Sequence, residues 1–303
     1  MPTSQGVMGT VCPRYEVAIF SYRDGPALNR CLERVSLMLE RYPGGAARLY
    51  AVDDGSGLTD VRTACEALGI ELVLEPRRFG KACSVAAALL HARAPVVVLV
   101  DGDGLPSPDA PAIALDVLAD STNGGVGGRN VPVNGGESWA ARAMALLWEV
   151  HDRVNARKPK LGGDMVAVRV APVAGRRLLA VDDASLEALL VAQDLRIVYR
   201  PDFIVEMRVP TTLREAIAQR RRIAAQYHHL ERAQRYRVST RQWSSVCRAL
   251  LTRPWPQHLA WLPLLCLIEV IARVLALIDA LGGWDYHLWE PTRTTKVGKG
   301  ETD

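Results

Sequence analysis

The sequence predicts an α/β protein built on a mostly parallel, doubly wound sheet with flanking helices. Over the first two thirds of the chain, short apolar segments alternate with longer segments whose apolar residues recur at helical spacing. Residues 95–101 (PVVVLVD) are apolar on both faces, as a central parallel strand is. With 49% hydrophobic and 23% charged residues, the 303-residue chain has a globular composition, which excludes disordered and collagen-like proteins.

The predicted elements follow one another as strand, helix and strand. Residues 14–22 (RYEVAIFSY) predict the first strand, and residues 26–39 predict a helix with one apolar stripe. Ligands of such sheets collect at the carboxyl ends of the strands, where loops carry polar groups without disturbing the core. The further predicted elements are strands at 47–53 and 70–74, a helix at 81–92 and a strand at 95–101.

We expect four parts along the chain. They are a flexible N-terminus (1–13), an α/β domain (14–240), a helical and membrane-associated segment (241–290) and a disordered tail (291–303). The six cysteines form no CxxC pair, so the sequence implies neither a zinc ribbon nor a disulfide framework. The first residues lack the pattern of a signal peptide, and we expect a cytoplasmic protein.

Two pairs of carboxylates follow predicted strands. Asp53 and Asp54 close the second strand, and Asp101 and Asp103 flank a glycine after the strand 95–101. Aspartate and glycine also make ordinary turns, so either pair alone is a weak signal. No Rossmann fingerprint or P-loop is present, and carboxylates two residues apart supply hard oxygen ligands for Mg²⁺ or Mn²⁺. Together the pairs predict a site in which a metal bridges to a nucleotide diphosphate.

Segments that match a known family occur in that family's order between about residues 15 and 226. Residues 53–56 read DDGS, residues 78–81 read RFGK and residues 101–103 read DGD. They resemble the DDGS, N-x-G-K and DxD segments of glycosyltransferase family 2, inverting enzymes with the GT-A fold. The resemblance implies that Asp53 contacts the base of a sugar nucleotide and that DxD holds the metal and the diphosphate or ribose.

Three later segments extend this resemblance. Residues 161–164 (LGGD) resemble the family's acceptor-side loop, which implies that Gly162, Gly163 and Asp164 face the acceptor. Residues 182–186 (DDASL) resemble ED-x-x-L, with Asp183 at the position of the catalytic base and Asp182 in place of Glu. Residues 219–223 (QRRRI) resemble QxxRW, but Ile stands where the family has Trp.

The chemistry of inverting transfer suggests a role for each of these side chains. We expect Asp183 to act as general base and Asp182 to orient it, although both could simply begin a helix over 184–192. Gln219 and Arg222 could bind the diphosphate, and the alternative for residues 220–222 is a water-facing helix surface. Lys81 opens a helix and could also hold phosphate.

The three histidines of the central region receive a structural interpretation. His151, His228 and His229 have no partner at metal-ligand spacing, and we interpret them as helix-surface residues. Nucleic-acid binding is not predicted, because the basic stretch 206–254 matches no recognisable module, although it holds eleven Arg and three Glu.

Residues 259–282 predict a long apolar helix that lies on a membrane surface. Glu269, Arg273 and Asp279 interrupt it, and each costs about 2.5–3.5 kcal/mol near a bilayer centre. The three charges fall in one sector, which indicates an amphipathic helix, and aromatic residues and arginines flank it. We therefore expect peripheral attachment at the cytoplasmic face of a membrane. The alternatives are packing on the α/β domain or in a homodimer, and a true span.

The expected function is metal-dependent, inverting transfer of a single sugar from a nucleotide-sugar donor to a hydroxyl acceptor. The resemblance favours a UDP-sugar, whereas a lipid carrier, a glycan and a small natural product remain open as acceptors. One alternative is a catalytically silent relative acting as a binding or scaffold subunit, because Ile223 and Asp182 depart from the family pattern. A sugar-phosphate nucleotidyltransferase is a second alternative, but the glycine-rich loop expected after its first strand is missing.

Overall fold

The computed structural model describes residues 12–52, 58–251, 259–282, 284, 288 and 292–296. The described strands are β1 (Tyr15–Ser21), β2 (Gly45–Val52), β3 (Glu71–Glu75), β4 (Val96–Asp101), β5 (Leu105–Pro106), β6 (Asn123–Pro132), β7 (Met165–Arg169) and β8 (Arg196–Met207). The described α-helices are α1 (Pro26–Arg41), α2 (Leu58–Leu68), α3 (Lys81–Leu90), α4 (Ala110–Ala119), α5 (Trp139–Asn155), α6 (Asp182–Val191), α7 (Leu213–Gln234), α8 (Trp243–Leu251), α9 (Leu262–Leu281) and α10 (Arg293–Lys296).

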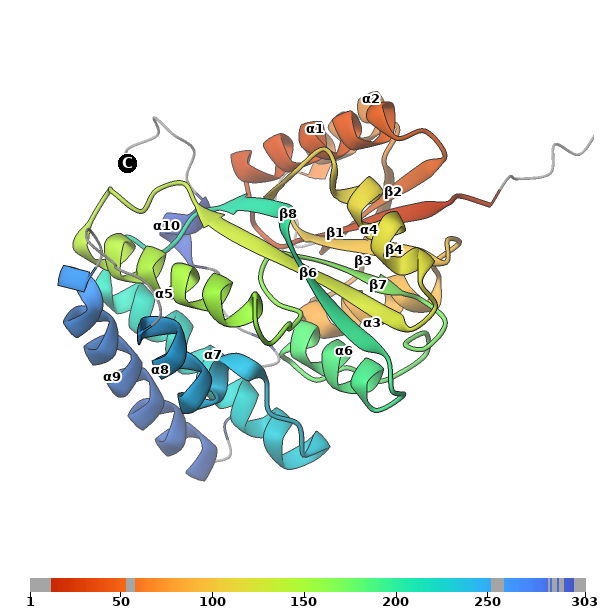
Figure 1. The fold of residues 1–303 in the computed structure, drawn as a ribbon. Helices are drawn as coiled ribbons and strands as arrows, with labels where there is room; N and C mark the ends of the chain where they lie inside the picture. Colours follow the sequence, from red (N-terminus) through yellow and green to blue (C-terminus); the bar gives the residue numbers. More distant parts are fainter. Residues whose placement is uncertain are drawn as a thin grey trace, which may run out of the picture.

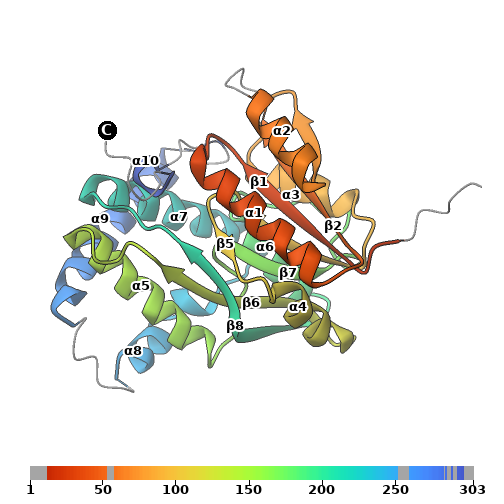
Figure 2. The same cartoon turned by 90° about the horizontal axis from the view of Figure 1, so that it is seen from above.

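The described strands form one mixed sheet in the order β3-β2-β1-β4-β7-β6-β8-β5 (Figures 1 and 2). β1 pairs in parallel with β2 and β4, and β2 pairs in parallel with β3, as the strand-helix order predicts. The interior of β4 is buried on both faces, from Val96 to Val100. Each such side chain stabilises the fold by roughly 1.5–3 kcal/mol. The predicted α/β sheet with flanking helices is confirmed.

Strand direction changes at β7, which the sequence does not reveal. β7 runs antiparallel to both β4 and β6, and β5 runs antiparallel to β8, so the second half of the sheet is mixed. The apolar period of a strand indicates which side chains are buried but does not indicate the direction of the strand. The expected parallel pairing is therefore found only in the first half of the sheet, among β1, β2, β3 and β4. The reversal matters for the site, because Val100 near the end of β4 pairs with Met165 at the start of β7. Asp164 therefore lies beside Asp101.

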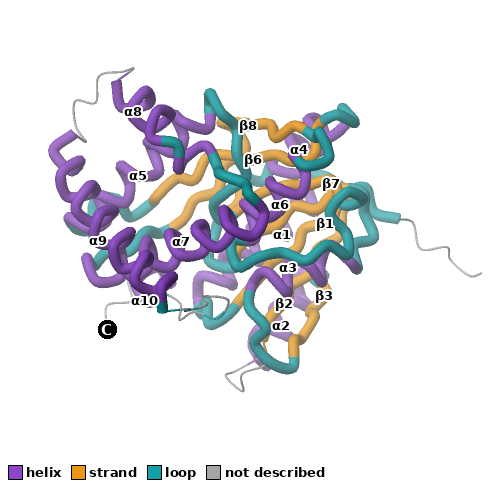
Figure 3. The backbone as a smooth tube through the Cα atoms, turned by 90° about the horizontal axis from the view of Figure 1, so that it is seen from below, coloured by secondary structure: helices purple, strands orange, loops and turns teal. Residues whose placement is uncertain are grey.

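Helices cover both faces of the sheet (Figures 2 and 3). On one face α1, α2 and α4 pack against alternate residues such as Val17 and Ile19 of β1. On the other face α3 and α6 pack against Ala18 and Phe20 of the same strand. This alternation follows from the two-residue period of a strand.

The C-terminal part forms a separate helical layer. Side chains of α5, α8 and α9 share a hydrophobic cluster, and α7 lies against α9 (Figure 1). The helix predicted within 259–282 is α9, preceded by a short 3-10 turn at Leu259–Trp261. The structure therefore shows this segment packed on the α/β domain.

Among the helices of the described residues, none is both long and apolar enough to cross a bilayer.

Candidate active site

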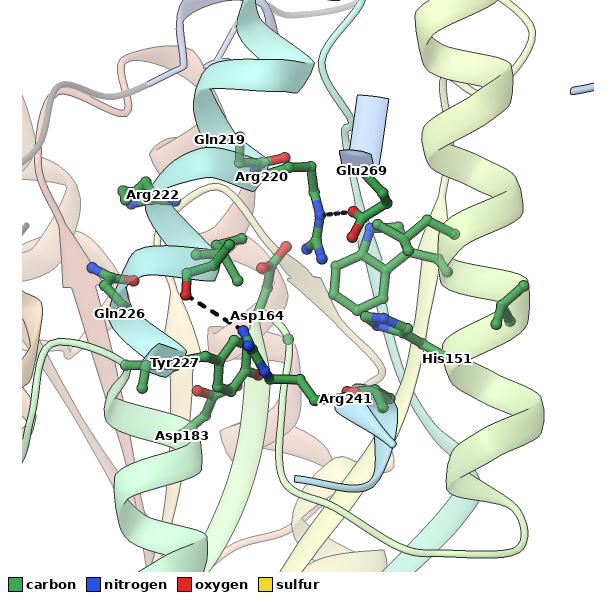
Figure 4. A pocket seen from close by; sticks show the side chains of 18 of the residues that line it. His151, Asp164, Asp183, Gln219, Arg220, Arg222, Gln226, Tyr227, Arg241 and Glu269 are labelled. Carbon is green, nitrogen blue, oxygen red and sulfur yellow. Dashed lines mark hydrogen bonds and ion pairs between the residues drawn. The ribbon is translucent and has the colours of Figure 1, made fainter. Parts of the chain in front are cut away.

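The predicted site residues gather around one cavity of about 460 Å³. It lies where β4, β7 and the first turns of α3 and α6 meet α7, and Figure 4 shows its lining. Asp53 and Asp54 lie outside the described residues. Gly162 is not part of the lining but directly precedes Gly163, which is. The predicted residues that line the cavity are Lys81, Asp101, Asp103, Gly163, Asp164, Asp182, Asp183, Gln219 and Arg222.

The turn after β4 presents the first two carboxylates. The Asp101 N–H donates to the Asp164 carbonyl over 2.8 Å, which ties the end of β4 to the start of β7. The Gly102 N–H donates to the Phe20 carbonyl of β1 over 2.8 Å, and the Gly104 N–H closes the turn on the Asp101 carbonyl. With its backbone groups paired in this way, the turn holds its carboxylates at the carboxyl edge of the sheet.

Lys81 connects the carboxylates of β4 and α6. Its Nζ atom lies 2.5 Å from Asp101 Oδ1 and 3.3 Å from Asp182 Oδ2, and all three side chains are largely buried. Burial lowers the pKa of Lys81, but Asp101 and Asp182 prevail and the pKa rises, so the ammonium stays charged. Burial, with Asp103 and Asp182 nearby, raises the pKa of Asp101 to about 7 against the opposing effect of Lys81.

Asp182 and Asp183 form the first turn of α6. Val181 stands at the N-cap position and makes no side-chain cap, so the helix begins at the two aspartates. Asp183 Oδ1 accepts the Ala184 N–H over 2.7 Å, and the positive end of the helix favours both carboxylates. Burial raises the pKa of Asp183, while Lys160 opposes the rise. Asp183 is thus a buried carboxylate whose proton affinity exceeds that of an ordinary aspartate.

The glycines of residues 162–163 are required by close approach. Gly163 has φ of +95°, and a Cβ atom there would lie 2.1 Å from Asn130 Oδ1. A Cβ atom at Gly162 would lie 2.5 Å from the Lys160 Nζ atom and 3.0 Å from Asp183 Oδ2. The loop backbone therefore passes directly beside Asp183, and the positive φ of Gly163 disfavours any residue with a Cβ atom at that position.

The three consecutive arginines of α7 have different surroundings: two pair with α9 and the third lines the cavity. Arg220 forms an ion pair with Glu269 of α9, and Arg221 Nε lies 2.6 Å from Asp279 Oδ2 of the same helix. Arg222 lines the cavity, where burial lowers its pKa to about 10 although Asp101 and Asp182 oppose this. The alternative of a water-facing run is therefore wrong.

Ile223, at the position of the family's Trp, takes part in packing. It lies against a small hydrophobic cluster that includes Val181, Tyr227 and Leu230, and it also lines the cavity. The residue therefore supports the loop before α6 from the side of α7.

Two charged residues at the site were missed from the sequence. Lys296 of α10 places Nζ 2.8 Å from Asp103 Oδ2 and also contacts Asp24, which is buried in the turn after β1. The Thr294 N–H donates to Glu215 Oε1 over 3.3 Å and anchors α10 on α7. Asp24 directly follows the first strand and could have been found by that position. No sequence pattern indicates that Lys296 belongs to the site, because it lies 193 residues after Asp103.

Lys160 and His151 also belong to the cavity. Lys160 is 4% exposed, and its Nζ atom lies 3.5 Å from the Tyr227 hydroxyl. His151 lines the cavity, and burial holds its pKa well below the usual range (Figure 4). The interpretation of His151 as a helix-surface residue is wrong, because α5 turns this face toward α7. A helical period alone does not identify the neighbour that a face meets.

A smaller cavity of about 80 Å³ adjoins the first one. The ends of β1, β2 and β3 line it, together with Asp101, Asp103 and Lys296. The Arg78 guanidinium carbon lies 4.0 Å from the centre of the Tyr22 ring, and the rings of Phe20 and Tyr50 stack at 5.6 Å. This end offers flat aromatic and guanidinium surfaces beside the carboxylates.

The carboxylates suit a hard divalent cation only together with outside ligands. In the part of the chain that the structure describes, no group of three or more His, Cys, Asp or Glu is arranged to hold a metal ion. Asp103 nevertheless contacts the Lys296 ammonium, which shows that a cation fits there. Asp101 and Asp103 fit Mg²⁺ or Mn²⁺ if diphosphate oxygens or water complete the coordination.

The mixed sheet with helices on both faces is the fold of GT-A glycosyltransferases. The chain belongs to glycosyl transferase family 2, whose family model matches residues 16–187, more than half of the chain.

The chain is similar to curated proteins that are named glycosyltransferases. An N-acetylglucosaminyltransferase of Rhizobium meliloti (strain 1021) is 25% identical over 237 residues, which are 70% of this chain and 55% of that protein. An N-acetylglucosaminyltransferase of Bradyrhizobium diazoefficiens is 24% identical over 244 residues, which are 72% of this chain and 50% of that protein. The chain thus spans about half the length of these relatives.

Solved structures show the likeness of the fold. A mannosyltransferase from Pyrobaculum calidifontis, in complex with GDP-Man and Mn²⁺, has a TM-score of 0.59 at 24% identity and covers 92% of this chain and 83% of its own. Glucosyl-3-phosphoglycerate synthase from Mycobacterium tuberculosis, with Mn²⁺, UDP-Glc and phosphoglyceric acid, has a TM-score of 0.51 at 16% identity. The shared part is 73% of this chain and 79% of the synthase.

Proposed function

We propose that the protein is a metal-dependent, inverting glycosyltransferase that moves a sugar from a nucleotide-sugar donor to a hydroxyl acceptor. One observation carries this proposal. Lys81 links Asp101, which we propose lies beside the diphosphate, to Asp182, next to the candidate base Asp183. The residues proposed for both halves of the reaction thus line one cavity.

The acceptor half of the reaction uses Asp183. Its carboxylate takes the proton of the acceptor hydroxyl while that oxygen forms a bond to the anomeric carbon. The bond from this carbon to the diphosphate oxygen breaks on the opposite face, which inverts the configuration. Burial raises the pKa of Asp183, which makes its carboxylate a stronger base than an exposed one. Asp182, Gly162, Gly163 and Asp164 shape the acceptor side.

The donor half of the reaction requires positive charge where the diphosphate departs. Arg222 and Lys81 supply fixed cations, and Gln219 lies one helical turn before Arg222 on the same face. Mg²⁺ or Mn²⁺ held by Asp101 and Asp103 would neutralise the two phosphates further. Because these charges act most strongly on the leaving group, they favour the transition state over the bound donor.

The smaller cavity is the proposed place of the nucleoside. Tyr22 and Arg78 offer surfaces for a base. Asp53 and Asp54 come directly after β2 in the sequence, and the resemblance implies that Asp53 contacts the base. The resemblance favours a UDP-sugar. The two solved relatives hold GDP-Man and UDP-Glc respectively, so guanine and uracil are the bases to compare.

The product and the place of action complete the proposal. We infer transfer of a single sugar, at the cytoplasmic face of a membrane, to a lipid carrier, a glycan or a small natural product. Trp284, one of the aromatics that predict membrane attachment, is 71% exposed, whereas Trp255, Tyr286 and Trp289 lie outside the described residues. A homodimer stays a prediction, which sedimentation velocity would check.

Calorimetric titration tests the donor site. The purified protein is titrated with UDP and with GDP, each with Mn²⁺ and with chelator. We expect one nucleotide to bind only with metal, and Asp103→Ala to lose that binding because it removes a metal ligand. Leu37→Ser, on α1 at the far side of the sheet, is the matched control and retains binding.

Two other outcomes would contradict the proposal. If folded protein binds neither nucleotide, the silent relative becomes the better interpretation. If binding is equal with chelator and unchanged in Asp103→Ala, the metal assignment is wrong while the donor site stands.

A further inference from the structure

Helix α9 carries an apolar face that no described residue covers. Residues three or four apart along the helix place side chains in a sector of roughly 100°. All of them are more than half exposed, and the exposed Trp284 follows the end of the helix. The members of this outer face are Leu267, Val270, Val274, Leu277, Ile278 and Leu281.

The charges of α9 point inward, which is the reverse of a surface helix in water. Glu269 pairs with Arg220 of α7 and with Arg273, and Asp279, only 3% exposed, pairs with Arg221. The charged sector is thus neutralised within the protein. The outer face is left with apolar side chains alone, an arrangement that marks a surface for another apolar phase.

A basic groove lies at the C-terminal end of this face. It lies between α3, the residues before α6, α7 and the end of α9, with a volume of about 520 Å³. Arg177, Arg232, His228 and His229 line it beside Trp284, and the described lining includes no Asp or Glu. The groove therefore complements an anion, and a tryptophan at its rim is typical of the boundary between water and lipid.

We propose that the outer face of α9 and this basic groove together dock the protein on the surface of an anionic bilayer. The apolar side chains enter the acyl boundary, Trp284 lies at headgroup depth, and Arg177 and Arg232 meet lipid phosphates. Charge complementarity singles out lipid as the occupant, because an apolar stripe flanked by cations matches the two layers of an anionic membrane.

Docking in this orientation has a consequence for the candidate active site. Cys266 and Val270 of α9 are exposed and also line the cavity of the candidate active site, so this cavity reaches the docking face. A lipid-held acceptor would therefore approach Asp183 without leaving the bilayer. This consequence rests on the proposed function, whereas the docking itself does not.

Vesicle flotation tests the docking with the full chain. The probes are vesicles of phosphatidylcholine, with and without phosphatidylglycerol. We expect the protein to float with the anionic vesicles, and Leu277→Ser/Leu281→Ser to lower the partition coefficient at least about tenfold, because the variant lacks two leucines that would enter the acyl boundary. Arg177→Gln/Arg232→Gln should lose the preference for anionic vesicles. Leu37→Ser, on the exposed side of α1, should float like the wild type.

Three results would overturn the proposal. They are a wild-type protein that floats with neither vesicle, an outer-face variant that floats like wild type, and a wild-type dimer that dissociates in that variant without vesicle binding. The last result would assign the face to a second copy of the chain. Nucleotide titration of the same sample separates the two proposals. UDP or GDP binding without flotation removes the docking and the proposed place of action at a membrane but leaves the proposed transfer reaction. Flotation without nucleotide binding removes only that reaction.

Discussion

Replacement of Asp183 by Asn removes the candidate base while keeping its shape. Asp183 Oδ1 accepts the Ala184 N–H over 2.7 Å, and an amide oxygen accepts the same bond. The lost charge at the helix start costs about 0.3–1 kcal/mol of stability, and relief from burying a carboxylate offsets part of it. The folded variant should therefore melt close to wild type, so that a loss of activity reports chemistry.

The expected loss of activity is much larger than the loss of stability. General base catalysis contributes about 10²–10⁴ in rate, or about 3–5 kcal/mol of the barrier. We expect Asp183→Asn to lower kcat by that factor with little change in the KM for the donor, because the diphosphate contacts of Arg222 and Lys81 remain. Asp182→Asn removes the charge that pairs with Lys81 but leaves the candidate base in place, so its effect on kcat should be less severe.

The assay is release of nucleoside diphosphate, measured against pH with a sugar donor and an acceptor found by screening. Burial raises the pKa of Asp183, and a base must be deprotonated, so the wild-type rate should rise with pH through that raised pKa. The variant should lack this rising limb. Turnover of Asp183→Asn at the wild-type rate, with the limb intact, would refute the assignment.

Three further changes probe neighbouring interactions. Lys296→Met should strengthen Mn²⁺ binding several-fold in titrations followed by electron paramagnetic resonance, because the ammonium no longer occupies Asp103; unchanged or weaker binding would contradict this. Asp279→Ala should lower the free energy of unfolding by about 1.5–3 kcal/mol in urea titrations, because Arg221 loses two charged hydrogen bonds. Burial raises the pKa of Glu187 to about 7, so folded protein binds the extra proton and stability falls as pH rises from about 4.5 to 7; Glu187→Gln should flatten that fall in urea titrations across this range.

Local patterns were sufficient for the elements and for much of the site. The apolar runs placed β1, β2, β3 and β4 within two residues of their ends. The carboxylates after β4 and at the start of α6 were identified from spacing and from the family resemblance, and the structure gathers them around one cavity. These features depend on neighbours in sequence, which a period or a motif records.

Long-range placement was decided only by the tertiary structure. The reversal at β7 brings Asp164 beside Asp101, and α10 brings Lys296 onto Asp103. The packing of α5 near α7 places His151 in the cavity wall. Strand direction and helix docking depend on contacts between segments far apart in the chain, and no local period encodes them. The same reason applies to α9. Its sequence predicts an amphipathic helix. Only the ion pairs with α7 show that the charged side faces the rest of the protein and that the apolar side is exposed.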